Sequence, residues 1–265
     1  MNKKIFFAII FVFHQAVFSD EPVKPNIELI EEIETMLNVK ISYKKFEIDN
    51  WKYSKYTIPK NYKLMNHFLE LMKQEFSKYP KGYFNKSNVQ TIVLAENYSF
   101  NGNRQAAMPD PFTRKLYYSI DGYTGRDGDY YLIHVLHHEL HHCAEYAIWN
   151  SQYFKWKEWS DLNEPDFNYG NGGLTAYKDK SKDYYSMTNP VPGFLNYYST
   201  LGQEEDRSEV FALMMSDEER PRLFEICKSD KIVKEKVKKI IKILNKLSKS
   251  KNNYWDEKNS TCGEE

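Results

Sequence analysis

Five of the chain's seven histidines fall within residues 132–146, which read LIHVLHHELHHCAEY. Imidazole nitrogens are common metal ligands, and histidines at positions i and i+4 of a helix can direct their rings to one ion. On a helix these histidines would form two stripes, one of His134, His138 and His142, and another of His137 and His141. Spacing alone therefore allows three pairs of metal ligands.

Glu139 selects one of these pairs. In the pattern H-E-x-x-H, the glutamate after the first histidine lies close to the metal and can take a proton from water. His138, Glu139 and His142 fit this pattern, whereas Val135 follows His134 and another histidine follows His137. The sequence thus predicts one Zn²⁺ ion held by His138 and His142, with Glu139 as general base.

The remaining histidines have other expected roles. His134 lies one turn upstream of His138 on the same stripe, which is compatible with a place beside the ligands. His137 and His141 are expected to pack in the interior or to lie on the surface.

A catalytic zinc site also needs a third protein ligand and an open position for water. The metzincin pattern would place a histidine at position 148, where this chain has Ile148. Glu145 follows His142 by nearly one turn and is a weaker candidate, more readily an outer partner or an exposed charge.

The stronger candidates lie in GQEEDRSEVFALMM, residues 202–215. Glu205 and Glu209 are four apart and share a helix face, so one carboxylate can bind zinc while the other orients a histidine ligand. The alternative is a solvated acidic helix start, because carboxylates favour a helix N-terminus.

The elements that must position these residues can be read from periodicity and turn signals. Helices are expected over residues 26–37, 61–78, 130–149, 203–216 and 231–249. Asn26 is the expected cap of the first helix, and Asp127 or Asp129 is expected to start the third. Strands are expected over residues 89–95 and 114–120. Residues 161–193 are rich in turn formers and predict a functional loop or a disordered one.

Helices combined with a few short strands predict an α+β fold, with a small sheet packed against helices. We expect a single domain over residues 20–250, with a helix and sheet part at 20–129 and a helical part at 130–250 that holds the metal site. Residues 251–265 are expected to form a flexible tail.

The N-terminus is typical of a secretory signal peptide over residues 1–19. Lys3 and Lys4 precede a short apolar run, and small residues precede a cut at Ser19–Asp20; an uncleaved anchor is the alternative. The mature chain would then be secreted or periplasmic, without membrane insertion. Export permits disulfides, so Cys227 and Cys262 can pair, whereas Cys143 is expected to be a small buried hydrophobe.

The composition narrows the class of partner. Basic and acidic residues balance at 37 each, so no basic excess points to a nucleic-acid partner. With 21 Tyr and 16 Phe, the chain is far from the composition of a disordered protein.

The motif HELHH, together with GFLNYYSTLGQEEDRSEVFALMM at residues 193–215, resembles the gluzincin metallopeptidases, and more specifically the anthrax lethal factor-like group. That group includes secreted proline-specific endopeptidases and zinc-binding metallopeptidases of bacterial secretomes. In it a tyrosine lies seven positions before the ligand glutamate and a second glutamate lies four after it. Tyr198, Glu205 and Glu209 stand at that spacing, whereas Arg207 and Ser208 depart from the group's usual residues.

The resemblance implies a zincin-like active-site helix, Glu205 as third ligand, Glu209 as the residue that orients a ligand histidine, and Tyr198 as hydrogen-bond donor to the oxyanion. It also implies that an edge strand holds the substrate, for which residues 104–119 are the candidates. The expected function is an exported zinc-dependent endopeptidase acting on peptides or proteins. The alternatives are an inactive exported zinc-binding or adhesion module, which the intact Glu139 argues against, and a zinc amidase acting on cell-wall peptides.

Overall fold

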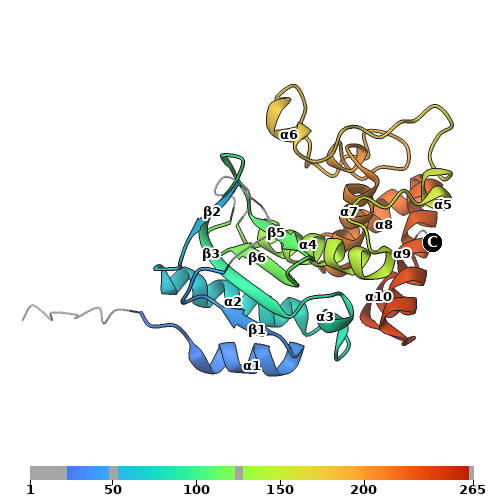
Figure 1. Ribbon diagram of the computed structural model, residues 1–265. Coiled ribbons are helices and arrows are strands. Elements are labelled where there is room, and N and C mark those ends of the chain that lie inside the picture. Colours follow the sequence, from blue (N-terminus) through green and yellow to red (C-terminus); the bar gives the residue numbers. More distant parts are fainter. Residues whose placement is uncertain (1–22, 48–52, 123–127, 263–265) are drawn as a thin grey trace, which may run out of the picture.

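A small mixed sheet forms one side of the molecule (Figure 1). The computed structural model describes residues 23–47, 53–122 and 128–262, and the predicted signal peptide over residues 1–19 lies outside them. The described strands are β1 (Lys40–Ser42), β2 (Ser54–Thr57), β3 (Thr91–Phe100), β4 (Asn103–Arg104), β5 (Ala107–Asp110) and β6 (Lys115–Ser119). They follow the order β1-β3-β6-β5, while β2 and β4 pair with β3.

The central strand β3 is buried on both faces. Ile92 and Leu94 contribute to the main hydrophobic core, whereas Val93 and Ala95 face a smaller cluster on the other side of the sheet. This explains the uninterrupted β-branched run, which is typical of a strand covered on both faces. The predicted strands at 89–95 and 114–120 are confirmed as β3 and β6.

Strand β5 forms the edge of the sheet and runs antiparallel to β6, whereas β1, β3 and β6 are parallel. The N–H of Ser119 donates to the carbonyl of Ala106, which sets the register. Successive residues of a strand alternate in direction, so the N–H and C=O of Ala107 point away from β6, toward the outer edge.

The first two helices are α1 (Ile27–Leu37) and α2 (Tyr62–Phe76), which pack on each other. Asn26 and Asn61 cap them, each accepting a backbone N–H of the first turn with its side chain, as expected for Asn26. A short helix, α3 (Tyr83–Lys86), follows α2.

Helix α4 (Asp129–Trp149) lies between the sheet and the C-terminal helices (Figure 1). It packs against α2, β5, β6 and α7 (Gln203–Met215), and it ends at Asn150 in a left-handed conformation. The hydroxyl of Tyr118 on β6 donates to the carbonyl of Leu136, which ties the helix to the sheet. Cys143 is buried on this helix, as expected.

Helix α7 runs through the interior and is buried on nearly every side, so it is not a solvated acidic helix. Its charged residues are paired with neighbouring elements instead. Asp206 lies 2.7 Å from the ammonium of the fully buried Lys236, and Arg207 forms an ion pair with Glu145 of α4. Glu145 is therefore not an exposed charge. The first pair joins α7 to α9 (Lys231–Ser248), and the second joins α7 to α4.

The segment between α4 and α7 contains α5 (Lys157–Ser160), α6 (Thr175–Lys178) and the short 3-10 helix η1 (Tyr198–Thr200). Polar contacts hold it on α7: the hydroxyl of Tyr169 donates to Asp206 at 2.6 Å, and the N–H of Gly172 donates to the carbonyl of Leu201 at 2.8 Å. The irregular stretch at 161–193 is thus placed by hydrogen bonds along the start of α7.

The C-terminal helices are α8 (Arg220–Ser229), α9 (Lys231–Ser248) and α10 (Tyr254–Asn259). The expected flexible tail from residue 251 is wrong for its described part. Trp255 is fully buried, and a disulfide joins Cys262 to Cys227 of α8. Among the described helices, none combines the length and apolar character that a membrane-spanning segment needs.

Candidate metal centre

Two histidines of α4 direct the same ring nitrogen to one point. The Nε2 atoms of His138 and His142 lie 3.1 Å apart, with their rings tilted by 75°. The i, i+4 spacing places both rings on the side of the helix that faces α7.

Glu205 reaches the same point from the first turn of α7. Its Oε2 atom lies 3.2 Å from Nε2 of His138 and 3.5 Å from Nε2 of His142. The structure thus brings together the three residues predicted as metal ligands, although Glu205 follows His142 by 63 positions in the sequence.

These three atoms fit a tetrahedral metal ion. Ligand atoms placed about 2.0–2.1 Å from zinc at tetrahedral angles are separated from one another by about 3.4 Å. The observed separations of 3.1, 3.2 and 3.5 Å bracket this value. Two nitrogens and one carboxylate oxygen are also a donor set typical of catalytic zinc.

The Nδ1 atom of each of these two histidines faces a side chain of α7. Nδ1 of His138 lies 2.9 Å from Oε1 of Glu209, a close polar contact that is bent away from hydrogen-bond geometry. Nδ1 of His142 lies 3.3 Å from the hydroxyl of Ser208. Partners of this kind fix the tautomer and the ring orientation, which leaves Nε2 for a metal.

A second group of potential ligands lies beside the first. Nε2 of His134 is 3.1 Å from Oε1 of Glu209, and His138 joins this group through its other ring nitrogen. His134 is therefore held one turn away from the first group, at the carboxylate that faces His138.

A cleft of about 440 Å³ opens beside the three converging atoms. Glu139, His142 and Glu205 lie in its wall, so the predicted base faces the same space as two of the predicted ligands. The other walls come from β5 (Ala107, Met108 and Pro109) and from the irregular segment (residues 171–174).

Tyr198 lies in the same wall and its ring is 6.0 Å from that of His138. Gly173 permits this arrangement. A Cβ atom added there would come within 2.3 Å of the Tyr198 hydroxyl oxygen and 2.5 Å of Oε1 of Glu205, so both side chains would have to move. The loop thus approaches both groups closely because residue 173 is glycine.

The electrostatics of the site follow from burial and close pairing. Burial alone would raise the pKa of Glu205, but hydrogen bonds and charge from His138 and His142 lower it to about 2. Burial opposes protonation of His138, yet Glu205 and Glu209 raise its pKa to about 10. The carboxylates strongly favour positive charge here, and a divalent cation supplies that charge while replacing protons.

The pKa values of Glu139 and Tyr198 are both raised. Burial raises the pKa of Glu139, with the charges of His138 and His142 acting against it. Burial, and then the charge of Glu205, raises the pKa of Tyr198 well above its ordinary value, so this phenol keeps its proton at neutral pH.

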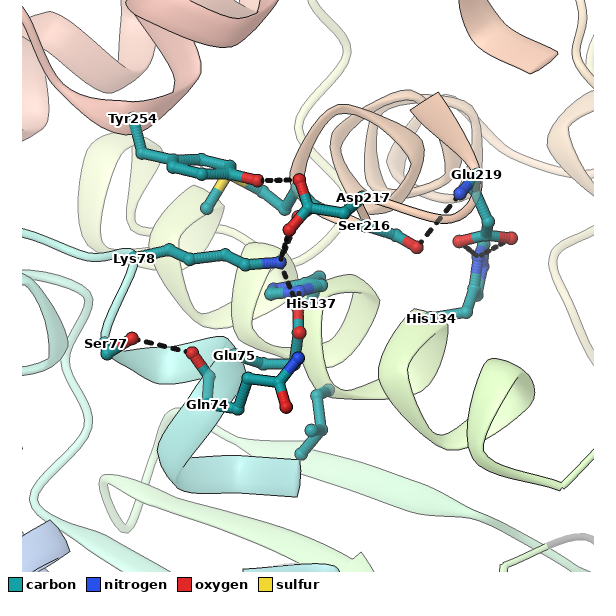
Figure 2. Close-up of polar contacts among 12 residues, drawn as sticks. Gln74, Glu75, Ser77, Lys78, His134, His137, Ser216, Asp217, Glu219 and Tyr254 are labelled. Carbon is teal, nitrogen blue, oxygen red and sulfur yellow. Dashed lines mark hydrogen bonds and ion pairs between the residues drawn. The ribbon is translucent and has the colours of Figure 1, made fainter. Parts of the chain in front are cut away.

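The second stripe of histidines packs in the interior. Nε2 of His137 lies 2.7 Å from Glu75 of α2 (Figure 2). Its Nδ1 lies 2.7 Å from the hydroxyl of Tyr79. Nδ1 of His141 lies 3.2 Å from Ser208, with its ring against Phe211. Of the two expected environments, interior and surface, both residues occupy the interior.

Sequence reasoning missed three features of the site. Ser208 enters the sequence analysis only as a departure from the resembling group, although a residue three positions after Glu205 shares its helix face. Gly173 lies in a segment interpreted as turn chemistry, and Glu219, which contacts His134 at 3.0 Å, carries no motif. All three depend on which segments meet in the fold.

No protein-family model matches the chain, and no curated protein matches it either. Among solved structures, the chain is similar to the crystal structure of a "putative zinc-binding metallo-peptidase" from Bacteroides caccae, with a TM-score of 0.52. The similarity covers 89% of each chain at 14% sequence identity. It confirms the predicted α+β fold, a small mixed sheet packed against helices around a zincin-like central helix.

Proposed function

We propose that the chain is a zinc-dependent endopeptidase of the gluzincin type, related to the anthrax lethal factor-like group. The observation that carries the proposal is the convergence of Nε2 of His138, Nε2 of His142 and Oε2 of Glu205 within 3.1–3.5 Å, beside a cleft that also contains Glu139. The motif spacing and the fold similarity to a protein whose name refers to zinc binding and peptide cleavage support it.

In this proposal His138, His142 and Glu205 would hold one zinc ion, which would supply Lewis acidity toward a water molecule and a peptide carbonyl. Glu209 and Ser208 orient the two imidazoles from behind.

The remaining steps belong to two side chains in the cleft. The carboxylate of Glu139 accepts the proton of the attacking water and then delivers it to the nitrogen of the leaving amine. The hydroxyl of Tyr198 donates a hydrogen bond to the carbonyl oxygen as negative charge develops there.

The substrate would bind as an added strand along β5. The backbone N–H and C=O of Ala107 point toward the outer edge, and Ala107 lies in the wall of the cleft with Glu139. Pairing with an extended peptide at this edge would give affinity through main-chain hydrogen bonds and would carry the scissile bond past Glu139. A peptide or protein substrate is therefore favoured over a compact small molecule.

We further propose that the mature chain begins near Asp20 and acts outside the cytoplasm, secreted or in the periplasm. The lysines and apolar run of residues 1–19 support export, and the disulfide between Cys227 and Cys262 is compatible with an oxidising compartment.

The proposal is tested with purified chain beginning at Asp20. We expect about one equivalent of zinc per chain by elemental analysis and cleavage of a peptide library that a chelator abolishes and zinc restores. Glu139→Gln should retain zinc and lose cleavage by about 10²–10⁴-fold or more, the contribution typical of a general base. Glu225→Gln, a matched change of an exposed carboxylate on α8, should be neutral.

The outcomes separate the competing functions. A chain without stoichiometric zinc contradicts the whole proposal. A zinc-loaded chain that cleaves cell-wall peptides but no member of the library indicates an amidase, and one that binds zinc and cleaves neither indicates an inactive module. Cleavage by the Glu139→Gln variant would contradict the role of the base.

A further inference from the structure

A partly exposed stripe of α4 continues beyond the candidate metal centre. Glu139, His142 and Tyr146 form this stripe, because residues at positions i, i+3 and i+7 share one face of a helix. The three residues are partly exposed, whereas residues 143–145 between them are buried. Glu139 and His142 lie in the wall of the cleft, and Tyr146 follows one turn later. The stripe therefore leads out of the cleft toward the end of α4.

Strand β5 runs beside this stripe in the same direction (Figure 1). At its start, Ala107 pairs with Tyr118, whose hydroxyl donates to the carbonyl of Leu136 in the first half of α4. In the turn after its end, the ring of Phe112 lies 5.5 Å from the ring of Tyr146, at an angle of 66°. The edge of the sheet and the partly exposed stripe thus both lead from the metal centre to this aromatic pair.

The turn that carries Phe112 is held by hydrogen bonds. The carboxylate of Asp110 accepts the backbone N–H of Thr113 at 3.2 Å and its hydroxyl at 2.7 Å. The side-chain amide of Asn88 donates to the carbonyl of Pro111 at 2.7 Å. Phe112 is nevertheless 51% exposed. Because the turn is already ordered, a ligand that covers this ring would lose little affinity to ordering the chain.

The spacing along α4 sets which part of a substrate would reach the pair. Tyr146 follows Glu139 by seven residues, which is about 10.5 Å along a helix. An extended peptide advances about 3.3–3.4 Å per residue, so about three residues span this distance. In antiparallel pairing, the commoner kind, the substrate would run opposite to β5, and the end that reaches Phe112 would precede the scissile bond.

We propose that Phe112 and Tyr146 form a specificity subsite for a large apolar side chain, carried by the third substrate residue before the scissile bond. That side chain would cover the exposed ring of Phe112. This inference rests on the proposed function and narrows its substrate class to extended peptides with such a residue at that position.

The experiment compares two peptides with one cleavage site that differ only at the third residue before it, Phe or Ser. We expect the zinc-loaded mature chain to cleave the Phe peptide with about 10-fold higher kcat/KM, since partial burial gives part of the transfer free energy of an aromatic side chain. The difference should lie in KM, as expected for binding that is equal in the ground state and the transition state.

The variants should change this preference and not the basal activity. Phe112→Ala should bring the ratio of the two kcat/KM values close to one and leave cleavage of the Ser peptide unchanged, which also reports that the variant is folded. Tyr146→Ala should lower the ratio in the same direction, whereas Phe112→Tyr keeps the ring and should preserve it.

Phe46→Ala is the matched control. Phe46 is 63% exposed and its ring lies 5.3 Å from that of Tyr56, which packs against the cluster on the other face of the sheet. This variant should retain the wild-type ratio.

Two results would overturn the inference alone: wild-type cleavage without a preference at this position, or an unchanged preference in Phe112→Ala. A preference that depends on Phe112 but lies after the scissile bond would contradict the antiparallel direction. A wild-type chain that cleaves no peptide would instead contradict the proposed function, and the inference with it.

Discussion

The two histidine stripes of α4 differ in what faces them. On one stripe, His138 and His142 each use Nδ1 for a protein partner and direct Nε2 to a common point. On the other, both nitrogens of His137 are occupied by Glu75 and Tyr79. One residue type on one helix thus forms part of a candidate metal centre on one side and packs in the interior on the other. The partner segments decide which, since α7 carries converging carboxylates and α2 does not.

Loss of a predicted metal ligand should have the largest effect on zinc affinity. His142→Ala should weaken zinc binding by more than about 100-fold, beyond the range for outer partners, because only two ligands remain. His141→Ala, the neighbouring change on the packing stripe, should lower stability by about 2–4 kcal/mol through lost packing and leave zinc affinity nearly unchanged. Equal loss of zinc in both variants, seen in chelator competition, would remove the distinction between the stripes.

Two adjacent tyrosines, Tyr197 and Tyr198, should differ in their effect on catalysis, because only Tyr198 lines the cleft. Tyr198→Phe should lower kcat by about 10²–10³-fold, the effect of losing one oxyanion donor, with zinc content unchanged. Tyr197→Phe is the control, because the Tyr197 ring contacts Lys182 and does not line the cleft. Similar kcat values for the two variants would rule out the role of Tyr198.

Ser208 lies between the stripes, since its hydroxyl contacts Nδ1 of both His141 and His142. Ser208→Ala should weaken zinc binding by about 10-fold, the lower end for an outer partner, because the hydroxyl is neutral. Ser216→Ala, which removes a hydroxyl that contacts the backbone of Glu219, should have a smaller effect. If Ser208→Ala binds zinc like the wild type, Ser208 only packs.

The stripe of His137 and His141 should contribute to stability in a way that depends on pH, through the partner of His137, Glu75. Burial opposes ionisation of Glu75, yet His137 and Lys78 lower its pKa below the ordinary 4.5. A carboxyl whose pKa is lower in the folded state stabilises the fold above the ordinary value, and this stabilisation disappears as pH falls through the folded-state pKa.

Glu75→Gln should therefore cost about 1–3 kcal/mol at neutral pH and less in acid, so the curves of the two proteins converge below pH 4.5. Denaturant unfolding at a series of pH values measures this. A constant difference between the proteins across that range would contradict the assignment.

The long elements could be predicted from the sequence, because apolar residues recur along them with the period of a helix or form an uninterrupted run. The helices at 26–37 and 61–78 and the strand at 89–95 have long or uninterrupted apolar patterns, and the structure contains them. The polar first half of 203–216 gives no sign that this helix is buried. By contrast, β1 has three residues and β2 four, too few for a period to show. Pairing with β3 defines both strands, and pairing is a tertiary property.

In the site, too, features that depend on local sequence could be predicted and features that depend on tertiary contacts could not. Helix phase and one glutamate were sufficient to select His138 and His142, because the selection is local to α4. The roles of Ser208, Gly173 and Glu219 depend on segments that meet only in the folded chain. The C-terminal tail was mispredicted for this reason: its polar composition suggests mobility, but a buried tryptophan and a disulfide hold it.

The position of zinc in crystals of the mature chain, located by anomalous diffraction at the zinc edge, tests the central claim most directly. We predict a single peak about 2.0–2.1 Å from Nε2 of His138, Nε2 of His142 and an oxygen of Glu205. A peak between His134 and Glu209, or the absence of bound zinc, would contradict the account.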